Sequence, residues 1–182
     1  MVEPGILGAV LAGGRSSRFG SDKAQAILGE ATLLDHAVAA LTPFCARVVV
    51  CGRTHPVHLT LPDRPGRDMG PLGGINAALH EACVRGMTGV LVTGCDMPAF
   101  PAELAHALIG PDAAVLRGQH LAAWWPVHLA PLLDAHLAAT DRYALRGWMD
   151  KVGPRVVCLP DLDLPNVNYR EDLDRLNSQS RS

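Results

Sequence analysis

Two patterns of apolar residues alternate along the chain. Short apolar runs of strand length are followed by segments in which apolar residues recur every three or four positions, the spacing of an amphipathic helix. The apolar runs predict strands at 6–12, 47–51, 90–93, 113–116, 121–127 and 155–159. The helical spacing predicts helices at 31–41, 71–82, 101–108, 129–137, 143–149 and 171–176. This alternation predicts an α/β fold with a parallel, doubly wound sheet.

The loops between these elements collect the glycines and charged residues. In open α/β sheets, ligands bind beyond the carboxyl ends of the strands, where loops lead into helices. We therefore expect the loops at 13–23, 62–71 and 94–98 to converge on one cleft.

Composition restricts the class of protein. The chain has 182 residues, 48% apolar and 19% charged, which suits one folded domain and excludes wholesale disorder. Its net charge of −2 argues against nucleic-acid binding, and no apolar run approaches the ~20 residues of a membrane span. We predict a single domain at 1–177 and a flexible tail at 178–182. The first residues lack the pattern of a secretory signal, so a soluble protein in the cytoplasm is expected.

The cysteines and histidines do not indicate a metal or redox site. The five cysteines are an odd number without a C-x-x-C pair, and we expect them to be small buried apolar residues. His55 and His58 lie three apart with no obvious third ligand, and we predict ordinary surface positions for both.

The loop after the first predicted strand has the chemistry of a phosphate site. Its sequence, LAGGRSSRFGSDK at 11–23, matches neither common phosphate motif. It nevertheless offers glycines for close backbone approach, two serines, and the charges of Arg18 and Lys23. We expect this loop to be exposed. The alternative is a glycine-rich surface turn with incidental basic residues.

Asp96 follows the apolar strand at 90–93 and precedes Met97-Pro98. A carboxylate at a strand tip beside a phosphate loop is well placed to hold Mg²⁺ against phosphate oxygens. The alternative for Asp96 alone is a turn residue.

The segment 70–74 opens a predicted helix with three glycines. Gly73 and Gly74 are costly inside a helix, so something approaches the backbone closely there, either a nucleotide base or a neighbouring strand. In the loop before it, Asp63 and Asp68 are candidates to accept hydrogen bonds from a base or ribose, or are solvated loop residues.

Two further pairs have a functional and a structural interpretation. Trp124 and Trp125 lie on opposite faces of a predicted strand, either both in the core or with one lining a ligand pocket; Pro126 makes this an edge strand or marks its end. Asn166 and Asn168 alternate about an apolar Val167 and point into a cleft, or Asn168 is the N-cap of the last helix.

Four segments together resemble the molybdenum cofactor guanylyltransferases. They are LAGGRSSRFGSDKA at 11–24, GPLGGINAAL at 70–79, LVTGCDMPAFP at 91–101 and NVNYREDL at 166–173, and they span essentially the whole chain. The first segment is specific for a broad group of nucleotidyltransferases. The last segment narrows the resemblance to the molybdenum cofactor branch of that group.

The resemblance implies a fold, a reaction and a set of site residues. The fold is a three-layer α/β/α sandwich with a Rossmann-like, mostly parallel sheet of the nucleotide-diphospho-sugar transferase type. The reaction joins GMP from GTP to the phosphate of molybdopterin or the molybdenum cofactor and releases pyrophosphate. The implied catalytic residues are Arg18, Lys23 and Asp96; the nucleotide-binding residues are Leu11, Ala12, Gly13, Gly14, Lys23, Asp63, Gly70, Pro71, Leu72 and Asp96; Asn166 and Asn168 face the pterin; and Asp96 binds Mg²⁺.

The chain departs from the family pattern at three positions. Phe19 stands where methionine is usual, and Tyr169 replaces a frequent threonine. Cys51 stands where some members have a nucleotide-binding asparagine, so the resemblance does not carry that contact over.

Other functions remain open at the level of sequence. One is a cytidylyltransferase acting on the same pterin, or a sugar-phosphate nucleotidyltransferase; Gly13 favours guanine, because the cytidylyl branch tends to have alanine there. Another is a nucleotide-binding regulatory domain without turnover. The expected partners are GTP and the pterin, with no nucleic acid or membrane, and with transient contacts to proteins that deliver or accept the cofactor.

Overall fold

The computed structural model describes residues 5–13 and 22–179. Within them, the strands of the main sheet are β1 (Ile6–Leu11), β4 (Arg47–Cys51), β5 (Leu59–Leu61), β6 (Gly89–Gly94), β7 (Ala114–Leu116), β8 (Gln119–Pro126) and β9 (Arg155–Val157). Their order is β5-β4-β1-β6-β8-β7-β9. β8 runs antiparallel to both of its neighbours, and the other paired strands are parallel. The predicted mostly parallel sheet is therefore confirmed.

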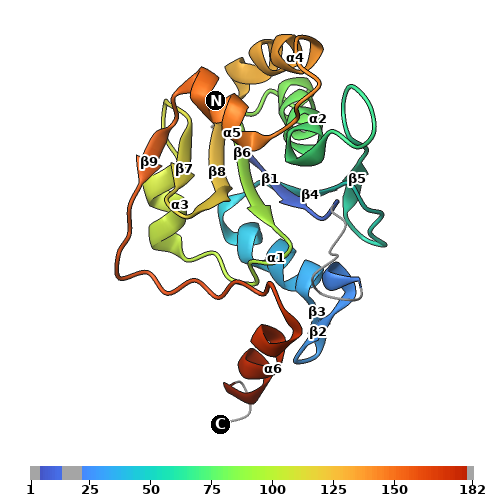
Figure 1. Ribbon diagram of the computed structural model, residues 1–182, viewed down its shortest axis with the longest axis vertical. Coiled ribbons are helices and arrows are strands. Elements are labelled where there is room, and N and C mark those ends of the chain that lie inside the picture. The colour runs from blue at the N-terminus through green and yellow to red at the C-terminus, as the bar shows by residue number, and fades with distance from the viewer. Residues whose placement is uncertain (1–4, 14–21, 180–182) are drawn as a thin grey trace.

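Helices cover both faces of this sheet (Figure 1). One face packs against α2 (Gly70–Val84), α4 (Ala130–Ala138) and α5 (Leu145–Val152), and the other against α1 (Leu33–Leu41) and α3 (Ala102–Leu108). The predicted three-layer α/β/α sandwich is confirmed. No helix in the described part of the chain is long and apolar enough to cross a membrane.

The central strands are apolar throughout because both of their faces are buried. Successive side chains alternate between the two faces. In β1, Leu7 and Ala9 therefore join the core under α2, while Val10 joins the core under α1. The two tryptophans of β8 follow the same rule: Trp125 lies in the first core and Trp124 in the second, and both are buried. A packing role thus accounts for both.

Several short elements were not predicted from the sequence. They are β5, the hairpin of β2 (Ile27–Leu28) and β3 (Ala31–Thr32), and 3-10 turns at Lys23–Gln25, Thr42–Phe44 and Val127–Leu129. The last helix, α6 (Arg170–Gln179), is longer than predicted and includes Ser178, which the sequence assigns to the tail. Residues 180–182 of that tail lie outside the described residues.

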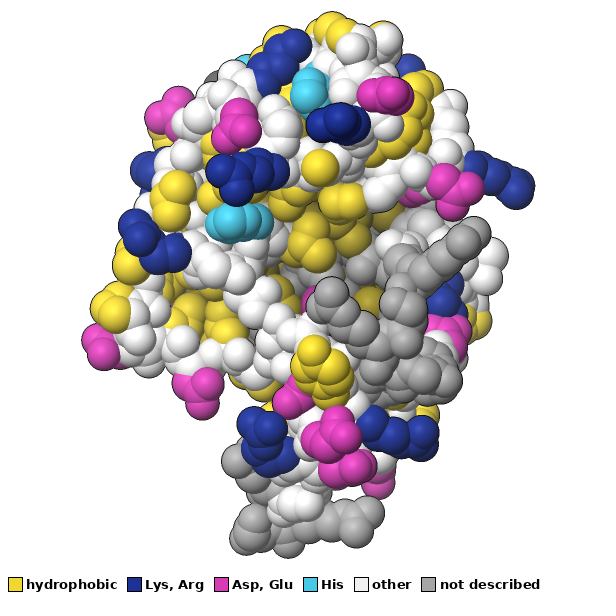
Figure 2. Space-filling model, in the orientation of Figure 1, with side chains coloured by type: hydrophobic (Ala, Val, Ile, Leu, Met, Phe, Trp, Pro, Cys, Tyr) yellow, Lys and Arg dark blue, Asp and Glu magenta, His cyan; other side chains and the backbone are white. Residues whose placement is uncertain are grey.

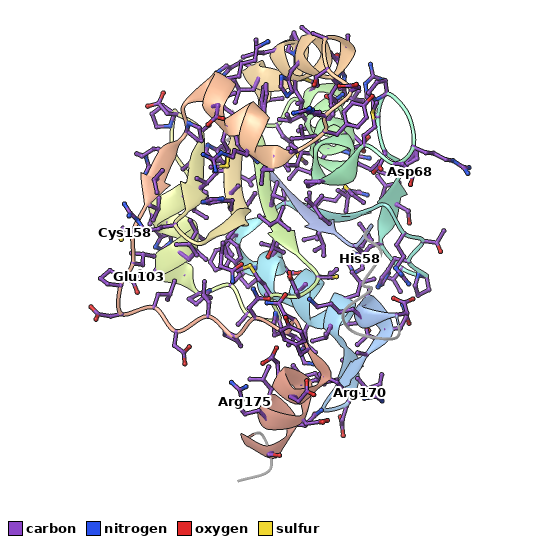
Figure 3. The ribbon with its side chains drawn as sticks, in the orientation of Figure 1. His58, Asp68, Glu103, Cys158, Arg170 and Arg175 are labelled. Atoms are coloured by element: carbon purple, nitrogen blue, oxygen red, sulfur yellow. The ribbon has the colours of Figure 1, made fainter. Side chains whose placement is uncertain are left out.

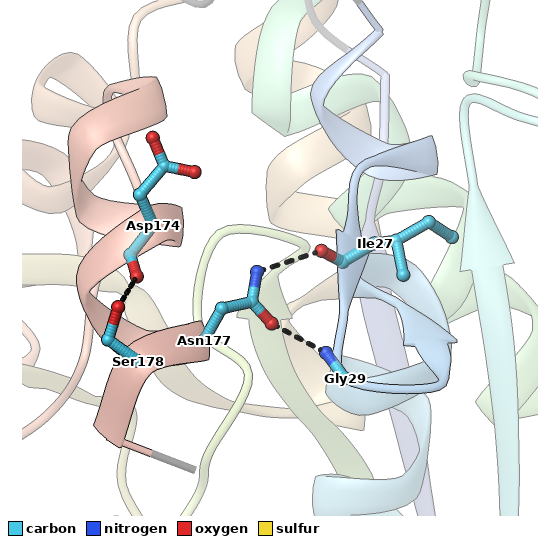
Figure 4. A pocket seen from close by; sticks show the side chains of 5 residues that line it. All are labelled: Ile27, Gly29, Asp174, Asn177 and Ser178. Atoms are coloured by element: carbon cyan, nitrogen blue, oxygen red, sulfur yellow. Dashed lines mark hydrogen bonds between the residues drawn. The ribbon is translucent and has the colours of Figure 1, made fainter. Parts of the chain in front are cut away.

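α6 packs on the β2–β3 hairpin. The side-chain amide of Asn177 donates to the Ile27 carbonyl (3.3 Å) and accepts from the Gly29 backbone N–H (2.8 Å), as Figure 4 shows. Between helix and hairpin, Val167 and Leu173 form a small apolar cluster with Leu33 of α1.

Two expectations about burial are wrong in part. Of the five cysteines, Cys51 is buried, Cys45 and Cys95 are half-buried, and Cys83 and Cys158 are exposed. Cys158 follows the edge strand β9 (Figure 3). The side chain of His55 is only 7% exposed. Its Nδ1 accepts from the backbone N–H groups of Val57 and His58, and its Nε2 lies 3.1 Å from a carboxylate oxygen of Asp35, so His55 is part of a turn rather than a free surface residue.

Candidate functional site

The carboxyl ends of β1, β4 and β6 lie side by side. Leu11 pairs with Cys51 on one side and with Gly94 on the other. Beyond the strands, the Ala12 N–H donates to the Cys51 carbonyl and the Cys95 N–H to the Leu11 carbonyl. The loop starts after these strands are therefore held together, as the rule for open sheets predicts.

Lys23 is buried rather than exposed, against our expectation for its loop. The residue is 9% exposed, and its ammonium lies 3.5 Å from Oδ2 of Asp96 and 3.4 Å from Oδ1 of Asn168. A buried charge is costly unless other groups pair with it. The structure thus brings together three predicted site residues from distant parts of the chain.

Asp96 is held in place by the backbone around it. Its carbonyl accepts from the Val167 N–H (2.9 Å), which attaches the segment containing Asn168 to the end of β6. Oδ1 of Asp96 lies so close to Gly94 that a Cβ added to the glycine would be 2.3 Å from it. The Asp96 carboxylate therefore packs against Gly94 through Oδ1 while Oδ2 faces Lys23, and a side chain at 94 would displace this carboxylate.

A cavity of about 150 Å³ opens at this point. Its lining combines the ends of β1 and β6 with charged side chains; the residues are Leu11, Ala12, Gly13, Asp22, Lys23, Ala24, Arg53, Gly94, Cys95, Asp96 and Leu121. Figure 2 shows hydrophobic side chains gathered in the middle of one face of the molecule, with lysine and arginine side chains above them. A larger hollow of about 380 Å³ lies away from these strand ends, between α6 and the β2–β3 hairpin.

Gly13 and Gly52 are in backbone contact at the edge of this cavity. A Cβ on Gly52 would lie 2.7 Å from the Gly13 Cα, and Gly52 has a φ of +80°, which favours glycine. The contact brings the loops after β1 and β4 together without intervening side chains.

Asp63 lies next to this contact, beneath the start of α2. A Cβ on Gly73 would be 2.8 Å from the Cβ of Asp63, and one on Gly74 would be 2.9 Å from a Leu11 methyl group and 3.0 Å from the Cys51 Cβ. The sequence left two explanations for these glycines, a nucleotide base or a neighbouring strand. The contacts above match the second, because other parts of the protein approach both glycines closely. Burial raises the pKa of Asp63, the Met69 N–H bonded to it lowers this pKa, and nearby Asp68 raises it.

The remaining predicted nucleotide residues, Gly70, Pro71 and Leu72, start α2 and do not line the Lys23 cavity. Gly70 has a φ of +56°, and a Cβ there would lie 3.2 Å from the Tyr143 carbonyl oxygen. Leu72 as a whole is fully buried in the core, so neither its side chain nor its backbone has surface open to a ligand in this structure.

The two asparagines near the end of the chain differ. Asn168 reaches Lys23, whereas Oδ1 of Asn166 is buried and has no hydrogen-bond partner within the described residues. The N-terminus of α6 uses Asp172, whose carboxylate accepts from the backbone N–H groups of Asn168 and Tyr169 and whose pKa these bonds lower. The Asn168 side chain is therefore directed to the site. Arg18 and Gly14 lie outside the described residues.

No thiol here is suited to act as a nucleophile. Burial, and then the charge of Asp63, raise the pKa of Cys51 to about 12. Burial raises the pKa of Cys95 to about 11, with the charge of Asp96 adding to the effect. Both thiols remain protonated near neutral pH, when they are poor nucleophiles.

Sequence reasoning missed Asp22 and Arg53 as cavity residues. Arg53 comes two positions after the strand at 47–51, so the rule that placed Asp96 also pointed to it. It also missed the buried Asn76, whose amide donates to the Asp134 carboxylate (2.8 Å) and to the Arg64 carbonyl (3.4 Å).

Comparison with known proteins identifies the family of this chain. Residues 8–156 match the family described as the MobA-like NTP transferase domain. A molybdenum cofactor guanylyltransferase from Acidiphilium cryptum is 34% identical over 177 residues, covering 91% of this chain and 90% of the relative. One from Rhodobacter capsulatus is 33% identical over 186 residues, covering 97% of each.

Solved structures share the fold. Molybdopterin-guanine dinucleotide biosynthesis protein A from Archaeoglobus fulgidus superposes with a TM-score of 0.72 at 22% identity, covering 96% of this chain and 98% of that one. A 2-C-methyl-D-erythritol 4-phosphate cytidylyltransferase from Thermus thermophilus has a TM-score of 0.69 at 15% identity, covering 96% and 98%. Rv0371c from Mycobacterium tuberculosis, solved in complex with manganese, has a TM-score of 0.65 at 16% identity, covering 97% and 100%.

Fold and family match together define a nucleotidyltransferase of the MobA-like class. Within that class, the two molybdenum cofactor guanylyltransferases above are 33–34% identical to this chain over at least nine-tenths of both sequences. This identity indicates a narrower family than the fold does. The chain belongs to the molybdenum cofactor guanylyltransferase family.

Proposed function

We propose that this chain transfers GMP from GTP to the terminal phosphate of molybdopterin, or of its molybdenum-containing form, and releases pyrophosphate. The observation that carries the proposal is that Lys23 and Asp96 line one cavity beyond β1 and β6, where Lys23 also contacts Asn168. The relatives, which are named molybdenum cofactor guanylyltransferases, supply the nature of the two substrates. The proposal includes a cytoplasmic location and transient contacts with proteins that deliver the acceptor or take the product.

The reaction must bring two anions together. An oxygen of the acceptor phosphate attacks the α-phosphorus of GTP in line as the bond to the β-phosphate oxygen breaks, so no protein nucleophile is needed. Lys23 offers three N–H donors, and its present contacts of 3.4 and 3.5 Å are long enough for phosphate oxygens to replace them. Arg18 and Gly14 join the phosphate site in this proposal on the family resemblance alone.

Mg²⁺ is the proposed metal, held by Asp96. Within the described residues, no three histidine, cysteine or acidic side chains gather into a metal cage. Mg²⁺ at nucleotide sites is usually held by one or two carboxylates together with substrate phosphates, so the single partly exposed carboxylate of Asp96 fits this ion. When bound, the ion supplies positive charge to the phosphate oxygens.

Guanine selection is assigned to the backbone of Leu11, Ala12 and Gly13, to the start of α2 at 70–72, and to Asp63. A carboxylate accepts hydrogen bonds from guanine N1–H and the exocyclic amine, an arrangement that cytosine lacks. A site with buried acceptors discriminates strongly, because the wrong base leaves them unpaired. The position of Asp63, against Gly73 and beside the Gly13–Gly52 contact, supports this assignment.

The pterin side is assigned to Asn166 and Asn168. The buried, unpartnered Oδ1 of Asn166 (within the described residues) supports a role as an acceptor for a ligand donor. Asn168 contacts Lys23 and would connect the acceptor phosphate to the nucleotide phosphates.

The test is pyrophosphate release with GTP, CTP, ATP or UTP, each with Mg²⁺ and molybdopterin. We expect release with GTP and loss of transfer by ~10²-fold or more in Asp96→Asn, with a smaller loss of GTP binding, because the metal acts on charge that develops in the transition state. The exposed Asp112→Asn is the matched control.

Each competing function predicts a different result. CTP used as well as GTP would indicate the cytidylyltransferase. Nucleotide binding without pyrophosphate release would indicate a regulatory domain. An Asp96→Asn variant with the wild-type rate and Mg²⁺ dependence would leave Asp96 as a turn residue.

A further inference from the structure

Arg53 lies directly beside the proposed nucleotide site. It follows Gly52 at the end of β4, and the backbone contact between Gly52 and Gly13 fixes where its side chain begins. The Gly52 N–H is further held by the Leu61 carbonyl (3.1 Å). The Arg53 side chain lines the same cavity as Lys23 and Asp96.

Among the residues that the structure describes, the charges of this cavity come in two pairs. Lys23 pairs with Asp96, and Nη1 of Arg53 pairs with Oδ2 of Asp22. Asp22 itself is largely accessible, with 45% of its side chain exposed. An ion pair to such a carboxylate is weak because water screens it and both side chains lose freedom.

The guanidinium has capacity beyond this pair. Arginine has N–H donors on three nitrogens in a planar fork, which suits phosphate oxygens. Nε of Arg53 is buried and has no hydrogen-bond partner within 5–13 and 22–179. A charged hydrogen bond to phosphate is stronger than one to a neutral group, and two parallel bonds add further strength.

We propose that Arg53 binds the phosphate chain of the nucleotide, exchanging the Asp22 carboxylate for phosphate oxygens. This inference rests on the proposed function. It adds Arg53 to Lys23 as a second cation among the described residues of the site. Asp22 is then the resting partner that holds the guanidinium at the cavity until the nucleotide enters.

The first experiment compares GTP and guanosine binding by calorimetry in Arg53→Gln, Arg53→Lys and the wild type. We expect Arg53→Gln to weaken GTP binding by about 10- to 100-fold, the size of a lost charged hydrogen bond, and to leave guanosine binding unchanged. Arg53→Lys should weaken GTP binding less, because it keeps the charge but loses the fork. Arg47→Gln removes the same charge from the exposed start of β4, and should bind GTP as the wild type does.

The second experiment separates phosphate binding from a purely structural ion pair. Asp22→Asn frees the guanidinium and removes a negative charge, so it should bind GTP at least as tightly as the wild type. Weaker binding in Asp22→Asn would mean that the pair orders the loop, and the inference would be wrong. Equal weakening of GTP and guanosine by Arg53→Gln, or none, would also overturn it. A wild-type protein that does not bind GTP would instead refute the proposed function.

Discussion

Lys23 has the surroundings of a cation that changes partners. Its ammonium is buried and makes two long contacts, to a carboxylate and to an amide oxygen. A permanent buried ion pair needs close geometry and several hydrogen bonds to offset the loss of water. The looser arrangement here holds Lys23 in position, while phosphate oxygens can replace both contacts.

The first prediction concerns this charge. Lys23→Met keeps the length and apolar body of the side chain, so the fold should persist, while GTP kcat/KM should fall by about 10- to 100-fold through loss of charged hydrogen bonds. The measurement is steady-state pyrophosphate release, with thermal unfolding as the check on folding. The chain has one other lysine, the exposed Lys151 on α5, and Lys151→Met should keep the wild-type kinetics. Unchanged kinetics in Lys23→Met would remove Lys23 from the site.

At the scale of elements, α1 begins with a reciprocal capping box. The Thr32 hydroxyl accepts from the Asp35 N–H, and the Asp35 carboxylate accepts from the Thr32 N–H. The Thr32 side-chain bond lowers the pKa of Asp35 and outweighs the opposing effect of burial, while the bond to His55 lowers it further. This start fixes the helix that packs beneath β1 and β4, and so supports the strand ends that carry the site.

The second prediction follows from that pKa. Because the pKa of Asp35 is lower in the folded protein than its ordinary value of 3.8, its stabilising effect is complete above that value and is lost as the pH falls through the lower, folded value. Asp35→Ala should therefore reduce the free energy of unfolding near neutral pH by about 1 kcal/mol, the usual size of a cap. The difference from the wild type should shrink in urea titrations below pH 4. A difference that does not depend on pH would contradict this account.

Sequence patterns predicted the elements that pack on both sides and missed those that depend on the tertiary structure. Runs such as 48–51 are apolar because both faces are buried. β5 and the β2–β3 hairpin have only two or three residues per strand, too few for a period to be visible. His55 is buried by a local turn and by its contact with Asp35 of α1, twenty residues earlier. Neither feature can be predicted from composition.

For the whole molecule, the strand-end rule predicted that the loops at 13–23, 62–71 and 94–98 converge on one cleft. Described residues of the first and third of these loops, including Lys23 and Asp96, line one cavity, whereas residues 62–71 do not line it. The rule did not predict which side chains pair. The relative positions of Lys23, Asp96 and Asn168 depend on strand register and on the path of the last segment. For the same reason it missed the bonds of Asn76 to Arg64 and Asp134, which join the loop after Asp63 to α2 and α4. Such long-range contacts exist only once the layers are assembled.

The last segment of the chain links the far edge of the sheet to the site. After β9 it runs along the outside of the molecule to α6, as Figure 1 shows, and on the way Val167 bonds to Asp96. The two large cores are complete without α6, whose own contacts are with the β2–β3 hairpin and Leu33. Folding and site assembly should therefore be separable.

The third prediction tests this separation with a chain that ends at Pro165. Because both large cores remain, it should unfold cooperatively at a lower temperature, whereas transfer should fall by ~10²-fold or more because Asn166, Asn168 and the bond to Asp96 are gone. Asn177→Ala is the matched control: it removes the two hydrogen bonds that dock α6 and should cost about 1–2 kcal/mol of stability, while Asn168 stays beside Lys23 and transfer continues. Circular dichroism melts and pyrophosphate release measure the two effects. A truncated chain that transfers GMP at the wild-type rate would show that the last segment is not part of the site.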